Sequence, residues 1–97
     1  MPHRVIWTEG ALRDLARHYA FMAEEDAEFG LKAVEAVEAG TLLLERFPGA
    51  GRPAADLEPE QKELLIPFGT SGYVLLYEVE GEKVFILALR HQRQAGY

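Results

Sequence analysis

The segment from Arg90 to Tyr97 contains the side chains of this sequence that are best suited to chemistry. It holds two arginines, one histidine and one tyrosine but no acidic residue, in a chain whose net charge is -6. Arginine holds phosphate through paired hydrogen bonds, histidine transfers protons near neutral pH, and tyrosine stacks on nucleobases. Arg90, His91, Arg93 and Tyr97 are therefore candidates for a phosphate-directed catalytic site or for a surface that contacts a target.

A structural role is the simpler interpretation of these side chains. In that case Arg90 and Arg93 pair with acidic residues of a helical hairpin, Tyr97 packs on a sheet, and Arg52 ties its loop to a helix or to an acidic residue. The remaining histidines do not lie at metal-ligand spacing, and no glycine-rich phosphate loop or dinucleotide motif is present. We therefore expect neither a metal ion nor a cofactor.

Composition limits the class of protein. A chain of 97 residues forms one domain, residues 1–97, with a modest core and no room for a large enclosed active site. The absence of cysteine excludes disulfides and is compatible with the cytoplasm. No apolar run is long enough to span a membrane or to form a signal peptide, so we expect a cytoplasmic protein.

The charge is unevenly distributed along the chain. Residues 8–47 carry nine acids against four bases. An acidic protein gains little from the counterion release that drives nucleic-acid binding, so no direct nucleic-acid binding is expected. A basic segment of a partner protein is suited to dock on this acidic region.

The first half of the chain predicts a strand and two helices. Residues 4–7 form a short strand, Thr8 caps a helix over about 9–24, and Asp26 caps a second helix that ends before Pro48. Gly40 in the second helix predicts close approach of another helix backbone. The two helices form an antiparallel hairpin. The apolar spacing of the first helix predicts its buried face: Leu12, Leu15, Ala16, Tyr19, Met22 and Ala23.

The second half predicts a loop over 48–59 and an antiparallel meander of three strands, 62–68, 73–79 and 83–90. The last strand is apolar at nearly every position, which predicts a central strand covered on both faces. The meander brings Arg90 beside the start of the 73–79 strand and leaves Lys62 about 20 Å away. The fold class is therefore α+β, with the order β-α-α-β-β-β.

This order of elements, together with several short motifs, resembles the RelE/ParE toxins of bacterial type II toxin–antitoxin systems. The resemblance spans nearly the whole chain, and its C-terminal part is similar to the ParE branch in particular. The motifs are Val5–Thr8 with Ala11–Leu15, Phe47-Pro48 with Gly51-Arg52, Ile66–Gly69 with Ser71–Tyr73, and Arg90–Arg93 with Gly96-Tyr97.

The resemblance implies one of two activities. RelE-like members cleave messenger RNA on the ribosome with basic residues on the sheet, whereas ParE-like members are associated with inhibition of DNA gyrase. The nuclease branch has lysines and an arginine where this chain has Leu65, Pro67 and Val74, while His91 and Tyr97 match its functional positions. Phosphodiester cleavage needs fixed cations for the developing negative charge. The apolar residues cannot supply them, which favours a member without nuclease activity.

We therefore expect a ParE-like, growth-inhibiting toxin of the plasmid-stabilisation type that acts by binding a protein. The resemblance implies DNA gyrase as its target and a cognate antitoxin, with which it would form a hetero-oligomer. One alternative is a ribosome-dependent endoribonuclease with a reduced site built from Arg90, His91, Arg93 and Tyr97. Another is a degenerate, non-toxic binding module.

Overall fold

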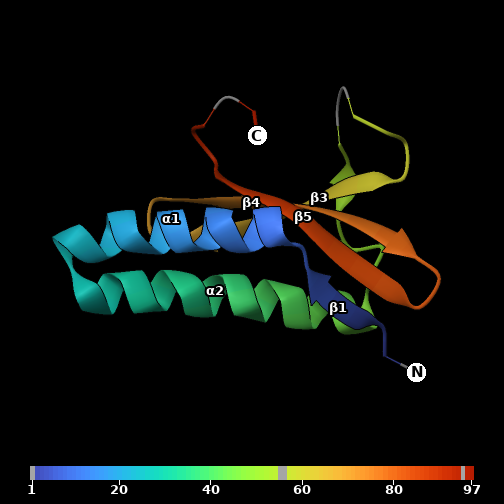
Figure 1. Ribbon diagram of the computed structural model, residues 1–97, viewed down its shortest axis with the longest axis horizontal. Helices are drawn as coiled ribbons and strands as arrows, with labels where there is room; N and C mark the ends of the chain where they lie inside the picture. Colours follow the sequence, from blue (N-terminus) through green and yellow to red (C-terminus); the bar gives the residue numbers. More distant parts are fainter. Residues whose placement is uncertain (1, 55–56, 95) are drawn as a thin grey trace.

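A two-helix hairpin lies against one face of a five-stranded sheet in the computed structural model of the chain (Figure 1). The structure describes residues 2–54, 57–94 and 96–97. Met1, Ala55, Asp56 and Ala95 lie outside the described residues, so parts of the predicted 48–59 loop and of the C-terminal segment are not covered. The elements are β1 (Arg4–Trp7), α1 (Glu9–Glu25), α2 (Ala27–Arg46), β2 (Arg52–Pro53), β3 (Gln61–Phe68), β4 (Ser71–Glu80) and β5 (Lys83–His91).

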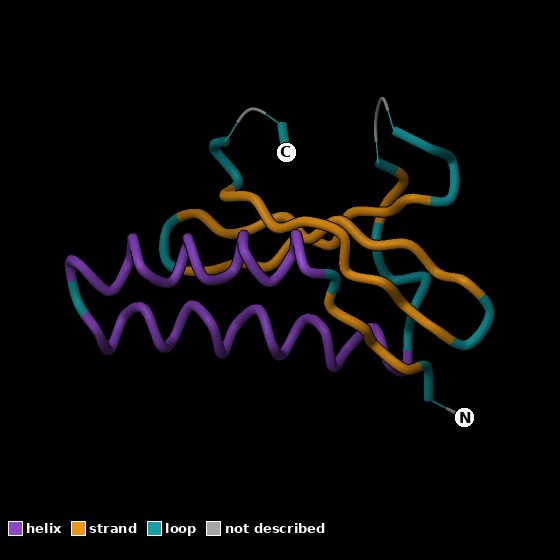
Figure 2. Tube along the Cα trace, viewed as in Figure 1, coloured by secondary structure: helices purple, strands orange, loops and turns teal. Residues whose placement is uncertain are grey.

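The sheet has the strand order β1-β5-β4-β3-β2, with β1 parallel to β5 and all other pairs antiparallel. The predicted α+β class, hairpin and meander are confirmed. Both helices lie on one side of the sheet, and the C-terminal segment and the loop before β3 rise from the other side (Figure 2). We call this second side the outer face.

One prediction about the strands is wrong, and one is only partly right. The predicted loop contains β2, which pairs with Lys62 and Glu63 of β3; two residues are too short to produce a strand pattern. Strand β5 does lie inside the sheet, between β1 and β4, as predicted, but the residues on its outer face are only partly buried. Composition indicates that a strand is covered, but it does not say which neighbours lie beside it.

The caps of both helices are confirmed. Thr8 Oγ1 accepts a hydrogen bond from the backbone N–H of Ala11 at 3.3 Å. Asp26 Oδ1 accepts from the N–H groups of Glu28 and Phe29 at 2.9 and 3.3 Å. These contacts satisfy N–H groups that have no partner within the helix itself.

The predicted buried face of α1 is only partly right: Leu15 packs against the core and Met22 and Ala23 are partly buried. Ala11 is completely buried, whereas Leu12 is 50% and Tyr19 36% exposed. The sheet-facing side also carries the polar residues Asp14 and His18, both of which contact β5. Apolar periodicity cannot locate a face whose contacts are partly polar.

The role predicted for Gly40 belongs to a different glycine. A Cβ on Gly40 would lie 2.9 Å from Ile66 Cδ1 of β3, so this glycine makes room for the sheet and not for a helix. A Cβ on Gly30 would lie 3.2 Å from the backbone nitrogen of Ala23 in α1. Gly30 therefore allows the close approach of the two helices.

Candidate functional site

The end of β5 presents consecutive residues on opposite faces of the sheet, as side chains of a strand do. His91 lies opposite Tyr73 of β4 on the helix side, while Arg90 lies opposite Val74 on the outer face. The predicted proximity of Arg90 to the start of β4 is thus confirmed. The four candidate side chains nevertheless do not form one site, because Arg90 and Tyr97 contact Glu63 on the outer face whereas His91 and Arg93 line a pocket beside α1.

On the outer face, three side chains converge on one carboxylate. Glu63 lies 3.6 Å from Arg90 and 3.5 Å from Arg52, measured between the charged atoms. The Tyr97 hydroxyl donates a hydrogen bond to Glu63 Oε2 at 2.5 Å, and the Arg90 guanidinium lies 5.2 Å from the centre of the Tyr97 ring. We call these four residues the Glu63 cluster.

The Glu63 cluster also holds the C-terminal segment in place. Arg90 Nη1 donates to the backbone carbonyl groups of His91, Gln92 and Gln94 at 3.1–3.4 Å. Burial, together with the hydrogen bond to Glu63, raises the pKa of the Tyr97 hydroxyl. Tyr97 therefore remains a neutral hydrogen-bond donor at physiological pH, and Arg90 is committed to contacts within the protein.

The predicted structural role of the arginines is partly right. Arg52 does pair with an acidic residue, but the acid that pairs with Arg90 is Glu63 of β3, not a residue of the helical hairpin. No carboxylate within the described residues lies at ion-pair distance from Arg93. Sequence reasoning missed Glu63, although its alternation with Leu64 and Ile66 would have placed it on the outer face.

The positions that carry cations in the nuclease branch do lie together. Leu65, Val74 and Arg90 form one row across β3, β4 and β5, and Pro67 follows on the same face. Lys62 lies opposite Tyr77, on the helix side of β3, and so cannot join them. Among the described residues, this row therefore offers phosphate only the guanidinium of Arg90, which pairs with Glu63; Arg52, the other arginine of the outer face, pairs with the same carboxylate.

On the helix side, α1 completes the edge of β5. Strand β1 ends at Trp7, opposite Ile86, so the backbone of Leu89 lies beyond it. Asp14 Oδ2 accepts from the Leu89 N–H at 3.0 Å, and His18 Nε2 lies 3.3 Å from the Leu89 carbonyl oxygen. These two side chains take the place of a neighbouring strand, which explains why α1 turns polar residues inward.

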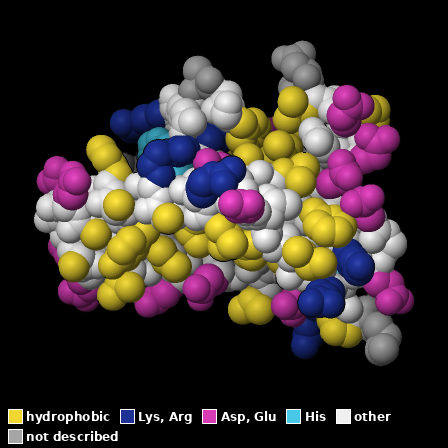
Figure 3. Space-filling model, viewed as in Figure 1, with side chains coloured by type: hydrophobic (Ala, Val, Ile, Leu, Met, Phe, Trp, Pro, Cys, Tyr) yellow, Lys and Arg dark blue, Asp and Glu magenta, His cyan; other side chains and the backbone are white. Residues whose placement is uncertain are grey.

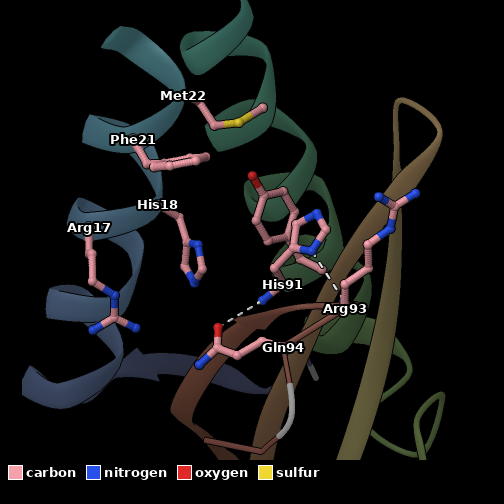
Figure 4. A pocket seen from close by; sticks show the side chains of 8 residues that line it. Arg17, His18, Phe21, Met22, His91, Arg93 and Gln94 are labelled. Atoms are coloured by element: carbon pink, nitrogen blue, oxygen red, sulfur yellow. Dashed lines mark hydrogen bonds between the residues drawn. The ribbon is translucent and has the colours of Figure 1, made fainter. Parts of the chain in front are cut away.

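A pocket of about 480 Å³ opens between α1 and the C-terminal segment (Figure 4). The Tyr73 ring contacts the rings of His18 and His91 edge-on, with centroid distances of 5.4 and 5.7 Å. Burial lowers the pKa of His18 against the opposing effect of its hydrogen bond to Leu89. The pocket is lined by Arg17, His18, Phe21, Met22, Tyr73, His91, Arg93 and Gln94.

The His91 ring is held in place by the backbone that follows it. His91 Nδ1 accepts a hydrogen bond from the N–H of Arg93 at 3.2 Å, and the His91 N–H donates to Gln94 Oε1 at 3.4 Å. Because Arg90 lies on the other side of the sheet, His91 and Arg90 cannot act together on one phosphate.

Within residues 2–54, 57–94 and 96–97, no group of three His, Asp or Glu side chains could hold a metal ion, and no helix could cross a membrane.

Comparison with known proteins identifies the family. The profile of the ParE toxin of the type II toxin–antitoxin system parDE matches residues 5–96. The chain belongs to the ParE toxin family. This toxin is also 30% identical to Toxin RelE1 of Caulobacter vibrioides over 91 residues, which cover 94% of this chain and 95% of that protein.

Solved structures support the fold. The chromosomal ParDE toxin–antitoxin system of P. aeruginosa matches with a TM-score of 0.74 at 24% identity, covering 92% of this chain and 95% of that one. The toxin–antitoxin complex RelBE2 of Mycobacterium tuberculosis matches with a TM-score of 0.55 at 26% identity, covering 94% and 99%. The matches include both ParE and RelE proteins. The family therefore shows that the chain is a toxin of a type II system, but it does not identify the target.

Proposed function

We propose that this toxin acts by binding a protein target, with DNA gyrase the first to test, and that it has no nuclease activity. The observation that carries the proposal is the outer face. Its row of Leu65, Val74 and Arg90 holds a single cation, and Glu63 pairs with that cation. A phosphorane-like transition state would meet arginines there that already share the Glu63 carboxylate, instead of unpaired cations, which opposes cleavage.

A cognate antitoxin is the second partner in this proposal. The structural relatives ParDE and RelBE2 are toxin–antitoxin assemblies. Hydrophobic side chains run along the exposed side of the hairpin, with acidic side chains at its margins (Figure 3). Such a surface suits an amphipathic segment with basic residues, laid along the helices. The exposed apolar residues of the hairpin include Leu12, Tyr19, Phe21, Phe29, Leu31, Leu42 and Leu43.

Purified toxin tests the proposed target directly in a gyrase supercoiling assay. We expect inhibition at micromolar concentrations that disappears when the cognate antitoxin is added in equal amount. The matched control is relaxation by a topoisomerase of a different class, which should not change. Absence of inhibition at these concentrations would exclude gyrase as the target.

A second candidate is ribosome-dependent cleavage of messenger RNA, which the relative Toxin RelE1 and the positions of His91 and Tyr97 favour. Mapping of RNA ends after induction separates the two functions, because only a ribosomal nuclease produces codon-biased cuts. The substitution His91→Ala gives the same answer by growth inhibition. We expect its effect to stay within a few-fold, whereas loss of a general acid or base costs about 10²–10⁴-fold.

Growth measurements also address the third possibility, a degenerate and non-toxic binding module. We expect expression of the toxin without its antitoxin to stop growth. Harmless expression of a folded chain would instead favour a module that only binds.

A further inference from the structure

The pocket between α1 and the C-terminal segment combines an apolar interior with a basic rim, in a protein that is acidic overall. Phe21, Met22 and Tyr73 provide apolar surface, while Arg17 and Arg93 lie on opposite sides of the opening (Figure 4). The volume of about 480 Å³ lies within the range of about 300–1,000 Å³ that is typical of ligand pockets.

The basic groups of this rim are available to a partner. Arg93 has no carboxylate at ion-pair distance among the described residues, and Arg17 has only Asp14, at 3.2 Å, with its side chain 61% exposed. The space-filling view shows basic side chains gathered next to histidine above α1 (Figure 3). By contrast, the arginines of the Glu63 cluster are already paired.

We propose that this pocket is the docking site for the protein target of the toxin. It takes an acidic segment of the target, whose apolar side chain inserts between Phe21 and Tyr73 while neighbouring carboxylates pair with Arg17 and Arg93. This inference rests on the proposed function, namely that the toxin acts by binding a protein. It adds the place of binding and the chemistry of the bound segment.

Charge distinguishes this occupant from the antitoxin. Residues 8–47, which form most of the hairpin, carry nine acids against four bases and attract a basic segment. The rim of the pocket carries two arginines, so it attracts an acidic segment. Two surfaces of opposite charge suit two different partners.

An NMR titration with a short peptide tests the chemistry of the pocket. The probe is a central phenylalanine flanked by two acidic residues on each side, compared with the same peptide carrying alanine at the centre and with one carrying lysines at the flanks. We expect the first peptide alone to shift the amide signals of Arg17, Phe21 and Arg93. Signals around Glu63 should stay unchanged.

Exposed residues allow variants that keep the fold. Arg93→Ala removes one exposed charge pair and should weaken binding of the acidic phenylalanine peptide about fivefold. Phe21→Ser, at a residue that is 68% exposed, should weaken it about tenfold through lost apolar contact. The controls Arg13→Ala and Leu42→Ser change the same residue types elsewhere on the hairpin and should leave the affinity unchanged.

Growth inhibition tests whether the occupant is the target. Arg93→Ala and Phe21→Ser should reduce toxicity in the same order as they reduce peptide affinity. The antitoxin should still bind Arg93→Ala with wild-type affinity, because Arg93 lies outside the hairpin. Full toxicity combined with lost antitoxin binding would assign the pocket to the antitoxin and overturn the proposal. Equal peptide binding by the pocket variants and their controls would also overturn it.

A different outcome marks failure of the proposed function itself. If the wild-type chain does not inhibit growth, or if it cuts messenger RNA, the proposed function is wrong and no target docks in the pocket. The peptide titration then still decides whether the pocket binds acidic segments.

Discussion

The two faces at the end of β5 differ in whether the protein satisfies its own basic side chains. On the outer face, Glu63 accepts contacts from Arg52, Arg90 and Tyr97. On the helix side, the pocket leaves Arg93 without a carboxylate among the described residues, and two histidines line it beside apolar surface. The outer face is closed by internal contacts, and the pocket is open to a partner.

This difference arises from two elementary properties of the chain. Alternation along a strand sends Arg90 and His91 to opposite faces although they are adjacent in sequence. A single carboxylate, Glu63, then decides the state of one face. Side chains that are clustered in sequence therefore form two sites with different chemistry, and only one of them remains free to bind.

The largest effect is expected when the closed face is opened. Glu63→Ala leaves Arg90, whose side chain is only 15% exposed, without its counter-charge, and frees Arg52 and Tyr97. The free energy of unfolding should fall by about 3 kcal/mol, as for other broken buried pairs. Urea denaturation measures it. Glu60→Ala, at an exposed position, should change it by at most about 0.5 kcal/mol.

Glu63→Ala should also change how strongly the outer face binds anions. Heparin affinity should rise in Glu63→Ala, because Arg52 and Arg90 are then free to bind an anion. If stability and heparin affinity both match those of Glu60→Ala, the outer face is not held closed by Glu63 and the contrast between the two faces fails.

A smaller effect is expected from Tyr97→Phe, which keeps the ring above Arg90 and removes the hydrogen bond to Glu63. The cost should be about 1 kcal/mol in the free energy of unfolding, as for one net hydrogen bond. Tyr19→Phe is the matched control, since the Tyr19 hydroxyl makes no hydrogen bond to the described residues. Equal costs for the two variants would show that the Tyr97 hydroxyl does not hold the C-terminal segment.

The smallest effect is expected for the pH dependence of stability that arises from His18 in the pocket. Burial lowers the pKa of His18 in the folded protein. At pH values between this lowered pKa and the ordinary pKa of about 6.5, the unfolded chain therefore binds more protons than the folded chain. This contribution to stability is complete above pH 6.5 and is lost as the pH falls toward the folded pKa. Arg17, Asp14 and His91 are the charged or titratable groups that act on this ring.

Urea denaturation at pH 7.5 and 5.5 checks the sign. The free energy of unfolding of the wild type should fall more on acidification than that of His18→Gln, while His3→Gln should behave like the wild type. A fall of equal size in His18→Gln would mean that acid sensitivity comes from groups outside the pocket.

The order of elements was predictable because each carries a local signal. Thr8 and Asp26 mark the helix starts, Pro48 marks the end of the second helix, and the glycines at 69 and 81 mark the turns between strands. The positions that lack cations, Leu65 and Val74, could also be located, because the nearby Ser71-Gly72-Tyr73 motif aligns them with the family.

Features that depend on contacts between distant segments were not predictable. The pairing of Glu63 with Arg90 depends on the register of three strands. Asp14 and His18 face the sheet because β1 ends before it reaches the backbone of Leu89. A glycine inside a helix, such as Gly40, indicates that another group approaches closely, but the sequence does not show that this group is Ile66 of β3. The pocket joins side chains from α1, β4 and β5 and has no local pattern.

The parallel pairing of β1 with β5 has a consequence for how the toxin is made. Thr8 Oγ1 donates to the carbonyl oxygen of Ile86 at 2.7 Å, a contact between residues 78 positions apart. Synthesis proceeds from the N-terminus, so β1 leaves the ribosome first and must wait for residues 83–86. Long-range pairing of this kind also slows folding. A growing chain therefore cannot complete its sheet, and the folded domain exists only after translation has passed β5.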